Sequence, residues 1–172
     1  GKMGNGLTLD GSSYVFNADE SDIHTTAAPM RNNDWSFETW VKPSGSSTAT
    51  QPIFFIGDGD GDEGDDEFQI GIRSKNIEMC FNDCSGASDE KEYFSANTLT
   101  EDEWTHIAVV WDASEDGHEV YIDGLRITAQ DATGFNWNSH SSFPTAGNTE
   151  YYLGKGDLAG SGNGVEDFDG ML

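Results

Sequence analysis

The sequence contains few cations and no long hydrophobic run. Lysine and arginine together number 8 against 32 aspartates and glutamates, which gives a formal net charge of −24. Proteins that bind nucleic acids neutralise phosphates with a basic surface, and this chain has too few cations to build one. The same balance argues against an anionic membrane surface, and no apolar segment approaches the ~20 residues of a membrane-spanning helix. We therefore expect no nucleic-acid partner and no membrane insertion.

Cysteine is also scarce. The chain has two, Cys80 and Cys84, and both lie in the segment CFNDC. A zinc site would need more cysteine or histidine nearby than this segment offers. An even number of cysteines in an acidic chain of extracellular type favours a small disulfide loop between them. Two free thiols are the alternative.

Helical periodicity is absent, and strand patterns replace it. Short segments alternate apolar and polar residues between clusters of Gly, Asp, Asn and Ser, which is typical of strands and turns. Segment 104–112 (WTHIAVVWD) is apolar at both sets of alternating positions, so we expect it to be buried on both faces. Asp123-Gly124 predicts a type I′ hairpin turn. The expected strands are 6–11, 13–17, 35–43, 52–57, 67–73, 76–81, 104–112, 118–124 and 150–156.

This number and spacing of strands predicts an all-β fold, a two-sheet antiparallel β-sandwich. Four of the five tryptophans fall within strand patterns, and we expect most of them in the core: Trp35, Trp40, Trp104 and Trp111.

The order of five segments resembles the LamG-like domains of the concanavalin A-like jelly-roll family. The segments are LTLDGSSYVF, WSFETWVKP, LTEDEWTHIAVVWDASEDGHEVYIDG, YYLGKG and FDGML. The resemblance implies one jelly-roll domain over residues 1–172, with a concave and a convex sheet. Members of this family continue with a further strand, so the resemblance also implies a domain that lacks its last strand or is interrupted at its C-terminal end.

The functional implication of this resemblance is a non-catalytic module for adhesion or ligand recognition. Its expected ligand is a glycan or another cell-surface molecule, and its expected setting is a larger bacterial surface protein whose other domains are its partners. We therefore expect an extracellular location at the bacterial cell surface. The alternative is a structural scaffold that presents a neighbouring or inserted binding domain and has no ligand of its own.

The most acidic segment is DGDGDEGDDE, residues 58–67, in which the residues are all Asp, Glu or Gly. Calcium takes six to eight oxygen ligands from carboxylates and carbonyls on a flexible backbone, and alternating Asp and Gly residues meet both needs. The segment is not an EF-hand loop, because Glu63 stands where that loop requires glycine. The alternative is a hydrated acidic loop that binds no metal.

The calcium interpretation gains from a second resemblance, to the pentraxins, a distant branch of the same superfamily that holds calcium on one sheet face. The acidic pair before FQIGI is similar to one of their calcium loops, and residues 154–157 with the acidic stretch that follows are similar to the other. The implied cofactor is Ca²⁺, held by two loops. The expected ligands are Asp60, Asp62, Asp65, Asp66, Asp157 and Glu166.

An enzymatic alternative rests on Glu63, Asp65 and Glu67, which match the E-x-D-x-E string of glucanases that share this sandwich. Two carboxylates that flank a glycosidic bond can act as nucleophile and acid/base. Such carboxylates must be held rigidly on a strand, whereas the residues between these three are Gly and Asp. The four histidines show neither HxH nor HExxH spacing, and no GxSxG elbow is present. We therefore expect no catalytic residues.

A candidate sugar-binding segment is GFNWNSHSSF, residues 134–143. Here Trp137 lies between Asn136 and Asn138, so its ring can stack on a pyranose while the two amides bond to hydroxyls. The alternative is that Trp137 packs against the edge of the sandwich and anchors its own loop.

Overall fold

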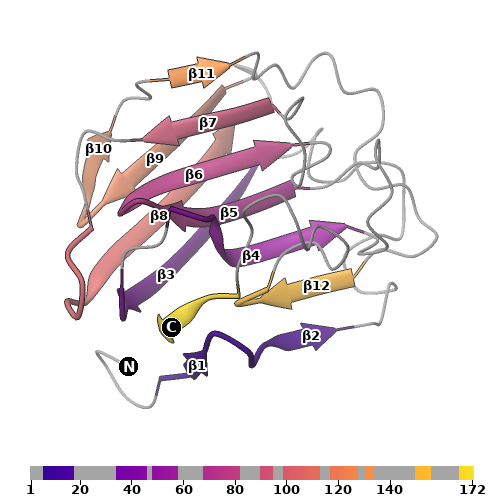
Figure 1. Ribbon diagram of the computed structural model, residues 1–172. Coiled ribbons are helices and arrows are strands. Elements are labelled where there is room, and N and C mark those ends of the chain that lie inside the picture. The colour runs from indigo at the N-terminus through magenta and orange to yellow at the C-terminus, as the bar shows by residue number, and fades with distance from the viewer. Residues whose placement is uncertain are drawn as a thin grey trace.

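A computed structural model shows an all-β protein built from two antiparallel sheets (Figure 1). The structure describes residues 6–17, 34–45, 48–57, 68–81, 90–94, 99–112, 117–127, 131–133, 150–155 and 167–172. These described residues include no helix long and apolar enough to cross a membrane. The predicted two-sheet sandwich is confirmed.

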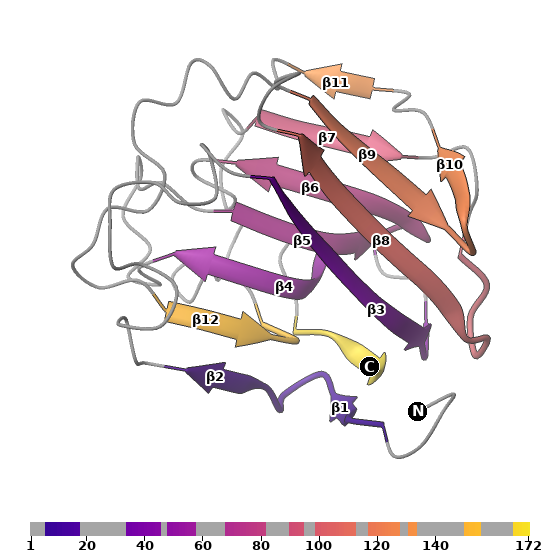
Figure 2. The ribbon, with the colours of Figure 1, turned by 180° about the vertical axis from the view of Figure 1, so that it is seen from behind.

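The first sheet has six strands in the order β1, β13, β3, β8, β9 and β10. The second has seven strands in the order β11, β7, β6, β5, β4, β12 and β2. Figures 1 and 2 show the two sheets stacked face to face, with their strands running in different directions. The six strands of the first sheet are β1 (Thr8–Asp10), β13 (Asp169–Met171), β3 (Trp35–Pro43), β8 (Thr105–Asp112), β9 (Gly117–Ile122) and β10 (Leu125–Ile127). The seven strands of the second are β11 (Asp131–Thr133), β7 (Glu90–Phe94), β6 (Asn76–Phe81), β5 (Phe68–Arg73), β4 (Gln51–Gly57), β12 (Glu150–Leu153) and β2 (Val15–Asn17).

Alternate residues of both sheets form one hydrophobic core. On β8, Ile107, Val109 and Trp111 are buried, as is every second residue of β5 beginning with Phe68. The ring of Trp35 on β3 meets that of Phe68 edge-on, with centroids 5.5 Å apart, so the two sheets touch directly. Full burial of each such side chain stabilises the fold by about 1.5–3 kcal/mol.

The expectation that segment 104–112 is buried on both faces is wrong. Val110 is 37% exposed, and Ala108 is only partly buried. Both lie on the outer face of the six-stranded sheet, because an antiparallel sheet of a sandwich packs against the core with one face only. Trp40, expected in the core, also lies on this outer face, where its ring is 5.1 Å from that of His106.

Two tight turns organise the hairpins. The predicted Asp123-Gly124 turn is confirmed between β9 and β10, with φ of +49° and +77°. A second turn joins β5 to β6 through Ser74 and Lys75, the two residues between the predicted strands 67–73 and 76–81, with φ values of +49° and +68°. Both turns use left-handed backbone, but the second does so without a glycine.

The last strand, β13, lies between β1 and β3 and pairs with both. Leu7 and Leu172 exchange two backbone hydrogen bonds of 2.9 Å, which extend the β1–β13 pair. Gly170 has a φ of +154°, and a Cβ atom there would lie 2.4 Å from the carbonyl oxygen of Lys42 on β3. Glycine at this position therefore lets β13 approach β3 closely.

Candidate functional site

The outer face of the seven-stranded sheet carries polar side chains that are buried. Strand alternation places Phe68 and its alternate residues toward the core, and Gln69, Gly71 and Arg73 on the opposite face. The Gln69 side chain is 1% exposed, and neither its oxygen nor its nitrogen has a hydrogen-bond partner. Buried polar atoms in folded proteins are nearly always paired, so this amide requires an explanation.

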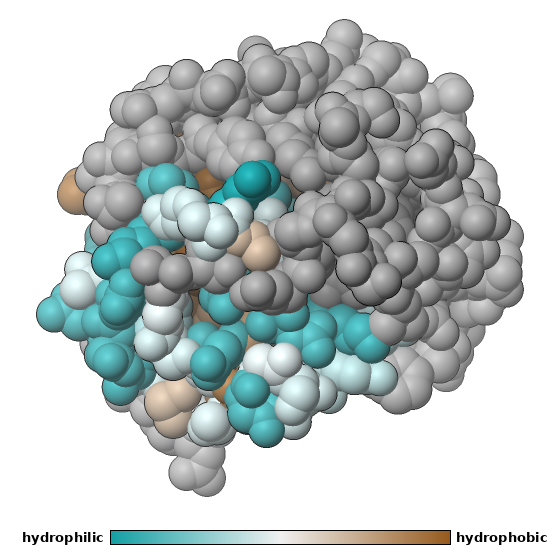
Figure 3. Space-filling view, viewed as in Figure 1, coloured by the Kyte–Doolittle hydropathy of each residue, from teal (hydrophilic) through white to brown (hydrophobic). Residues whose placement is uncertain are grey.

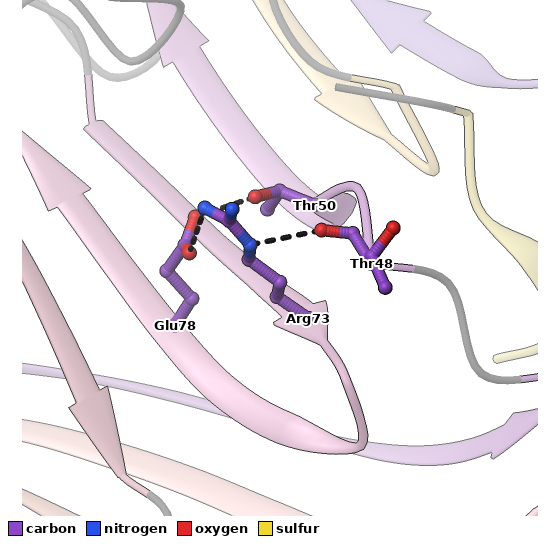
Figure 4. Close-up of polar contacts among 4 residues, drawn as sticks. All are labelled: Thr48, Thr50, Arg73 and Glu78. Carbon is purple, nitrogen blue, oxygen red and sulfur yellow. Dashed lines mark hydrogen bonds and ion pairs between the residues drawn. The ribbon is translucent and has the colours of Figure 1, made fainter. Parts of the chain in front are cut away.

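Glu78 lies on β6 directly opposite Gly71, and its side chain is also 1% exposed. Thr50 Oγ1 donates a 2.7 Å hydrogen bond to Glu78 Oε1. The second carboxylate oxygen, Oε2, is 3.7 Å from Arg73 Nη1, and Arg73 Nε donates a 2.9 Å bond to the carbonyl of Thr48 (Figure 4). A buried carboxylate is thus held from one side by a hydroxyl and from the other by a guanidinium that is 40% exposed.

Gly71 makes this arrangement possible. A Cβ atom at residue 71 would lie 2.9 Å from Thr50 Cγ2 and 3.0 Å from the carbonyl oxygen of Gln51. The missing side chain therefore gives Thr50 the space to reach Glu78 across β5. Glycine inside a strand often marks such a close approach.

Aromatic side chains continue this face toward the β2 edge of the sheet. Phe55 pairs with Gln69 across β4 and β5, and Tyr152 on β12 pairs with Phe55. The ring centroids of Phe55 and Tyr152 are 6.0 Å apart, and those of Tyr152 and Tyr14 are 5.6 Å apart. Lys155 Nζ lies 4.0 Å from the centroid of Tyr14, a residue that is 41% exposed. The row thus ends in an accessible ring with an ammonium group over one of its faces.

The visible described residues of this face are mainly hydrophilic, with hydrophobic side chains in the depth between them (Figure 3). The Gln69 amide offers one acceptor and two donor hydrogens, and the Glu78 carboxylate offers acceptors only. Together with the aromatic row, these groups suit a ligand that has many hydroxyls and a few apolar C–H faces.

The outer face of the other sheet is polar in a different way, because its charged groups pair with one another. Arg126 Nη2 lies 3.1 Å from Glu119 Oε1, and the Tyr121 hydroxyl donates to the same carboxylate. This hydrogen bond raises the pKa of Tyr121. His106 Nε2 lies 3.6 Å from a carboxylate oxygen of Glu38, which is 75% exposed. None of the polar side-chain atoms of the residues just named is buried without a hydrogen-bond partner.

The predicted calcium ligands lie outside the described residues: Asp60, Asp62, Asp65, Asp66, Asp157 and Glu166. So do the predicted sugar contacts Asn136, Trp137 and Asn138, and the E-x-D-x-E residues. Among the described residues no group of three His, Cys, Asp or Glu is placed to hold a metal. The calcium and sugar contacts therefore stay predictions.

The strand register nevertheless fixes where the predicted loops attach. Gly57, the last residue of β4, pairs with Glu150, the first of β12, and the start of β5 pairs with the end of β6. Acidic segment 58–67 and the segment that carries Trp137 are thus joined to the same end of the sheet. The segment with Asp157 leaves from the opposite end of β12, where Leu153 pairs with Phe54. The two expected halves of the calcium site therefore begin at opposite ends of the β4–β12 pair.

Cys80 is fully buried on β6 and is disulfide-bonded. Its predicted partner, Cys84, lies outside the described residues, so the pairing itself stays a prediction.

The polar cluster at Gln69 and Glu78 was not predicted from the sequence. Both residues occupy alternate positions of short strands, where polar side chains usually face water. The one available signal was Gly71, since glycine within a strand indicates the close approach of another group.

A family model described as the concanavalin A-like lectin/glucanases superfamily matches residues 17–172. The chain belongs to this superfamily. No curated protein matches the sequence. The predicted LamG-like resemblance is thereby confirmed at the level of the superfamily and its fold.

Solved structures with this fold include several carbohydrate-related proteins. The CBM40 domain of the Ruminococcus gnavus IT-sialidase, bound to α2,3-sialyllactose, superposes with a TM-score of 0.65 at 14% identity, covering 98% of this chain and 86% of that one. Domains LG4-5 of the mouse laminin α1 chain give a TM-score of 0.59 at 10% identity, covering 94% of this chain and 38% of theirs. The leech intramolecular trans-sialidase gives 0.61 at 16% identity, with 98% and 24% covered. At these identities the likeness concerns the fold.

Proposed function

We propose that this chain is a non-catalytic carbohydrate-binding module. The observation that carries the proposal is the Gln69 amide, which is 1% exposed, has no hydrogen-bond partner on either polar atom, and lies on the same sheet face as Glu78. An unpaired buried polar group costs about 1–3 kcal/mol. A protein that retains this cost gains from it when a ligand supplies the missing partners.

Two further points support a glycan as that ligand. Phe55 and Tyr152, which are 0% and 4% exposed, connect the polar cluster to Tyr14, whose 41% exposed ring is suited to the apolar C–H face of a sugar. The CBM40 structure with sialyllactose has the same fold and is a binding module. Fold alone does not determine function, so the polar cluster of this chain carries the argument.

The setting we propose is the surface of a bacterial cell, within a larger extracellular protein. Ca²⁺ is the proposed cofactor. Segment 58–67 is the stronger candidate for the calcium ligands. It is joined to the Gly57 end of the β4–β12 pair, whereas Asp157 follows the other end of β12. To share one ion, one of these two segments would have to pass along the β4–β12 pair to the opposite end. In this proposal calcium orders the loops that are joined to the Gly57 end of the sheet.

A glycan array probed with and without a chelator tests the function. A carbohydrate-binding module should give reproducible signals for a related set of glycans, and a calcium-dependent one should lose them in the chelator. An array that stays blank in both conditions would contradict the proposal and favour the structural scaffold. Sugar hydrolysis that is lost in the Glu63→Gln and Glu67→Gln variants would instead favour the enzymatic alternative.

Thermal unfolding tests the metal separately. Specific binding should raise the melting temperature with increasing calcium by mass action, while sodium chloride of equal ionic strength should not. An equal effect of the two salts would mean that calcium only screens the net charge of −24.

A further inference from the structure

The second oxygen of Glu78 has spare capacity to accept a hydrogen bond. Thr50 donates to Oε1 at 2.7 Å, whereas the contact of Oε2 with Arg73 Nη1, at 3.7 Å, is too long to be a hydrogen bond. Oε2 is buried and has no hydrogen-bond partner. Both side chains are 1% exposed, so a ligand has to displace what covers them before it meets the acceptor on Glu78 and the donor and acceptor on Gln69.

The cations around this cluster are already engaged. Arg73 is neutralised by the Glu78 carboxylate and bonded to the Thr48 carbonyl. Lys75, in the turn after Arg73, has its ammonium group 2.9 Å from a carboxylate oxygen of Glu101. Lys155 lies over the Tyr14 ring, beyond β4 and β12 from Gln69. The cluster of Gln69, Thr50, Arg73 and Glu78 thus carries no net positive charge.

We propose that this cluster binds neutral, hydroxyl-rich sugars and rejects acidic ones. The inference rests on the proposed function and specifies its ligand. A sugar hydroxyl can donate to Glu78 Oε2 or Gln69 Oε1 and accept from Gln69 Nε2. A carboxylate or sulfate group can only accept, so it leaves the two protein acceptors unpaired. It also brings a like charge toward a buried carboxylate in a chain of net charge −24.

This specificity differs from that of a structural neighbour. The Ruminococcus gnavus CBM40 domain was solved with sialyllactose, which is an acidic sugar. The charge of the present cluster predicts that the matching glycan without its sialic acid binds better. The shared fold places no constraint on this choice, because the side chains on the sheet face determine it.

Matched glycan pairs test the inference directly. Each neutral glycan on an array is compared with its sialylated, sulfated or uronate counterpart at about physiological ionic strength, where charge effects extend over about 8 Å. We expect neutral members to bind and acidic members to bind at least tenfold more weakly. Acidic members that bind as tightly as neutral ones would overturn the inference but leave the proposed function standing. Absence of binding to every glycan would overturn both.

A charge-removing variant then assigns the discrimination to Glu78. Glu78→Gln retains the shape of the side chain and an acceptor for Thr50, so we expect the preference for the neutral member of each pair to shrink at least threefold. The control is Glu38→Gln, which removes one carboxylate from the outer face of the opposite sheet. An equal change in both variants would mean that overall charge, not this cluster, sets the preference.

A variant of nearly equal shape tests Gln69. In Gln69→Met the amide is replaced by an apolar group, so we expect glycan binding to weaken at least tenfold while the melting temperature stays the same or rises. A merely structural glutamine would show the reverse, a lower melting temperature with binding retained. That result would overturn the role given to Gln69.

Discussion

Thr50 and Glu78 lie 28 residues apart in sequence and are joined by a 2.7 Å hydrogen bond across β5. The bond reaches over Gly71 on β5 and joins the residue just before β4 to β6. Because Glu78 is 1% exposed, water does not readily replace a lost partner. This contact fixes the carboxylate whose second oxygen, Oε2, is buried and is the proposed acceptor for a ligand hydroxyl.

Replacing Thr50 with valine tests the strength of this contact. Thr50→Val retains the shape of the side chain but removes the donor, and a lost hydrogen bond to a buried charged group costs about 1.5–3 kcal/mol. Chemical denaturation should show this decrease in the free energy of unfolding. Thr39→Val is the control, because the Thr39 hydroxyl makes only a 3.4 Å bond to the carbonyl of Trp40. Equal losses in the two variants would contradict a special role for Thr50.

Substitution of Gly71 should destabilise the protein through a clash. In Gly71→Ala the new methyl group would lie 2.9 Å from Thr50 Cγ2 and 3.0 Å from the Gln51 carbonyl oxygen. Overpacking of this kind costs about 1–3 kcal/mol, and we expect glycan binding to weaken as Thr50 is displaced. Gly45→Ala, where no atom lies within 4 Å of the new methyl group, should leave both properties nearly unchanged. A stable Gly71→Ala variant would show that Thr50 can move without loss.

The turn between β5 and β6 offers a stabilising substitution. Lys75 has a φ of +68°, a left-handed conformation that costs a non-glycine residue about 1–2 kcal/mol. Lys75→Gly removes this cost and loses an exposed ion pair with Glu101 that is worth at most about 1 kcal/mol. We therefore expect a slightly higher melting temperature. Glu101→Gln removes the ion pair and leaves Lys75 in place. A loss of stability in this variant as large as the relief of backbone strain would cancel the predicted gain.

The carboxylate of Asp167 should make stability depend on pH. Burial raises its pKa above the ordinary value of 3.8, and nearby Lys155 offsets part of this shift. The folded state therefore holds this proton to higher pH than the unfolded state, so this group lowers stability as the pH rises from 3.8 through the raised pKa.

Asp167→Asn should accordingly unfold at a higher temperature than the parent at neutral pH, and the difference should vanish below about pH 3.8, where both states are protonated. Asp102→Asn is the control, since the Asp102 side chain is 76% exposed. A gain for Asp167→Asn that persists at low pH would point to a cause other than the buried charge.

The strands were predictable from the sequence where apolar and polar residues alternate clearly. The burial of their side chains was not predictable in the same way. FQIGIR and NIEMCF were correctly predicted as strands, and the Asp123-Gly124 turn was found in the predicted place. The alternation did not reveal that Gln69 and Glu78 are buried, because exposure depends on neighbouring elements that a strand pattern does not describe. β7 (EKEYF) was missed because its charged residues do not alternate with apolar ones, and β11 has only three residues.

Trp40 and Val110 show the opposite error. Their apolar character suggested the core, yet both lie on the outer face of the six-stranded sheet. Aromatic and β-branched residues suit a strand on either face, so composition alone could not assign the side. The candidate site was accordingly less predictable than the fold, since it depends on which polar residues are buried together.

The place of β13 also determines when this domain can be completed during synthesis. The Ser44 hydroxyl bonds to its acceptor late in synthesis, because it donates to the carbonyl of Asp169, which lies 125 residues further along the chain. A ribosome that adds about 5–20 residues per second needs about 6–25 s to make that interval. Throughout it, β1 and β3 are already made and lack the strand that joins them. The nascent chain thus carries unpaired strand edges until β13 emerges, and a chaperone that shields such edges would act in that interval.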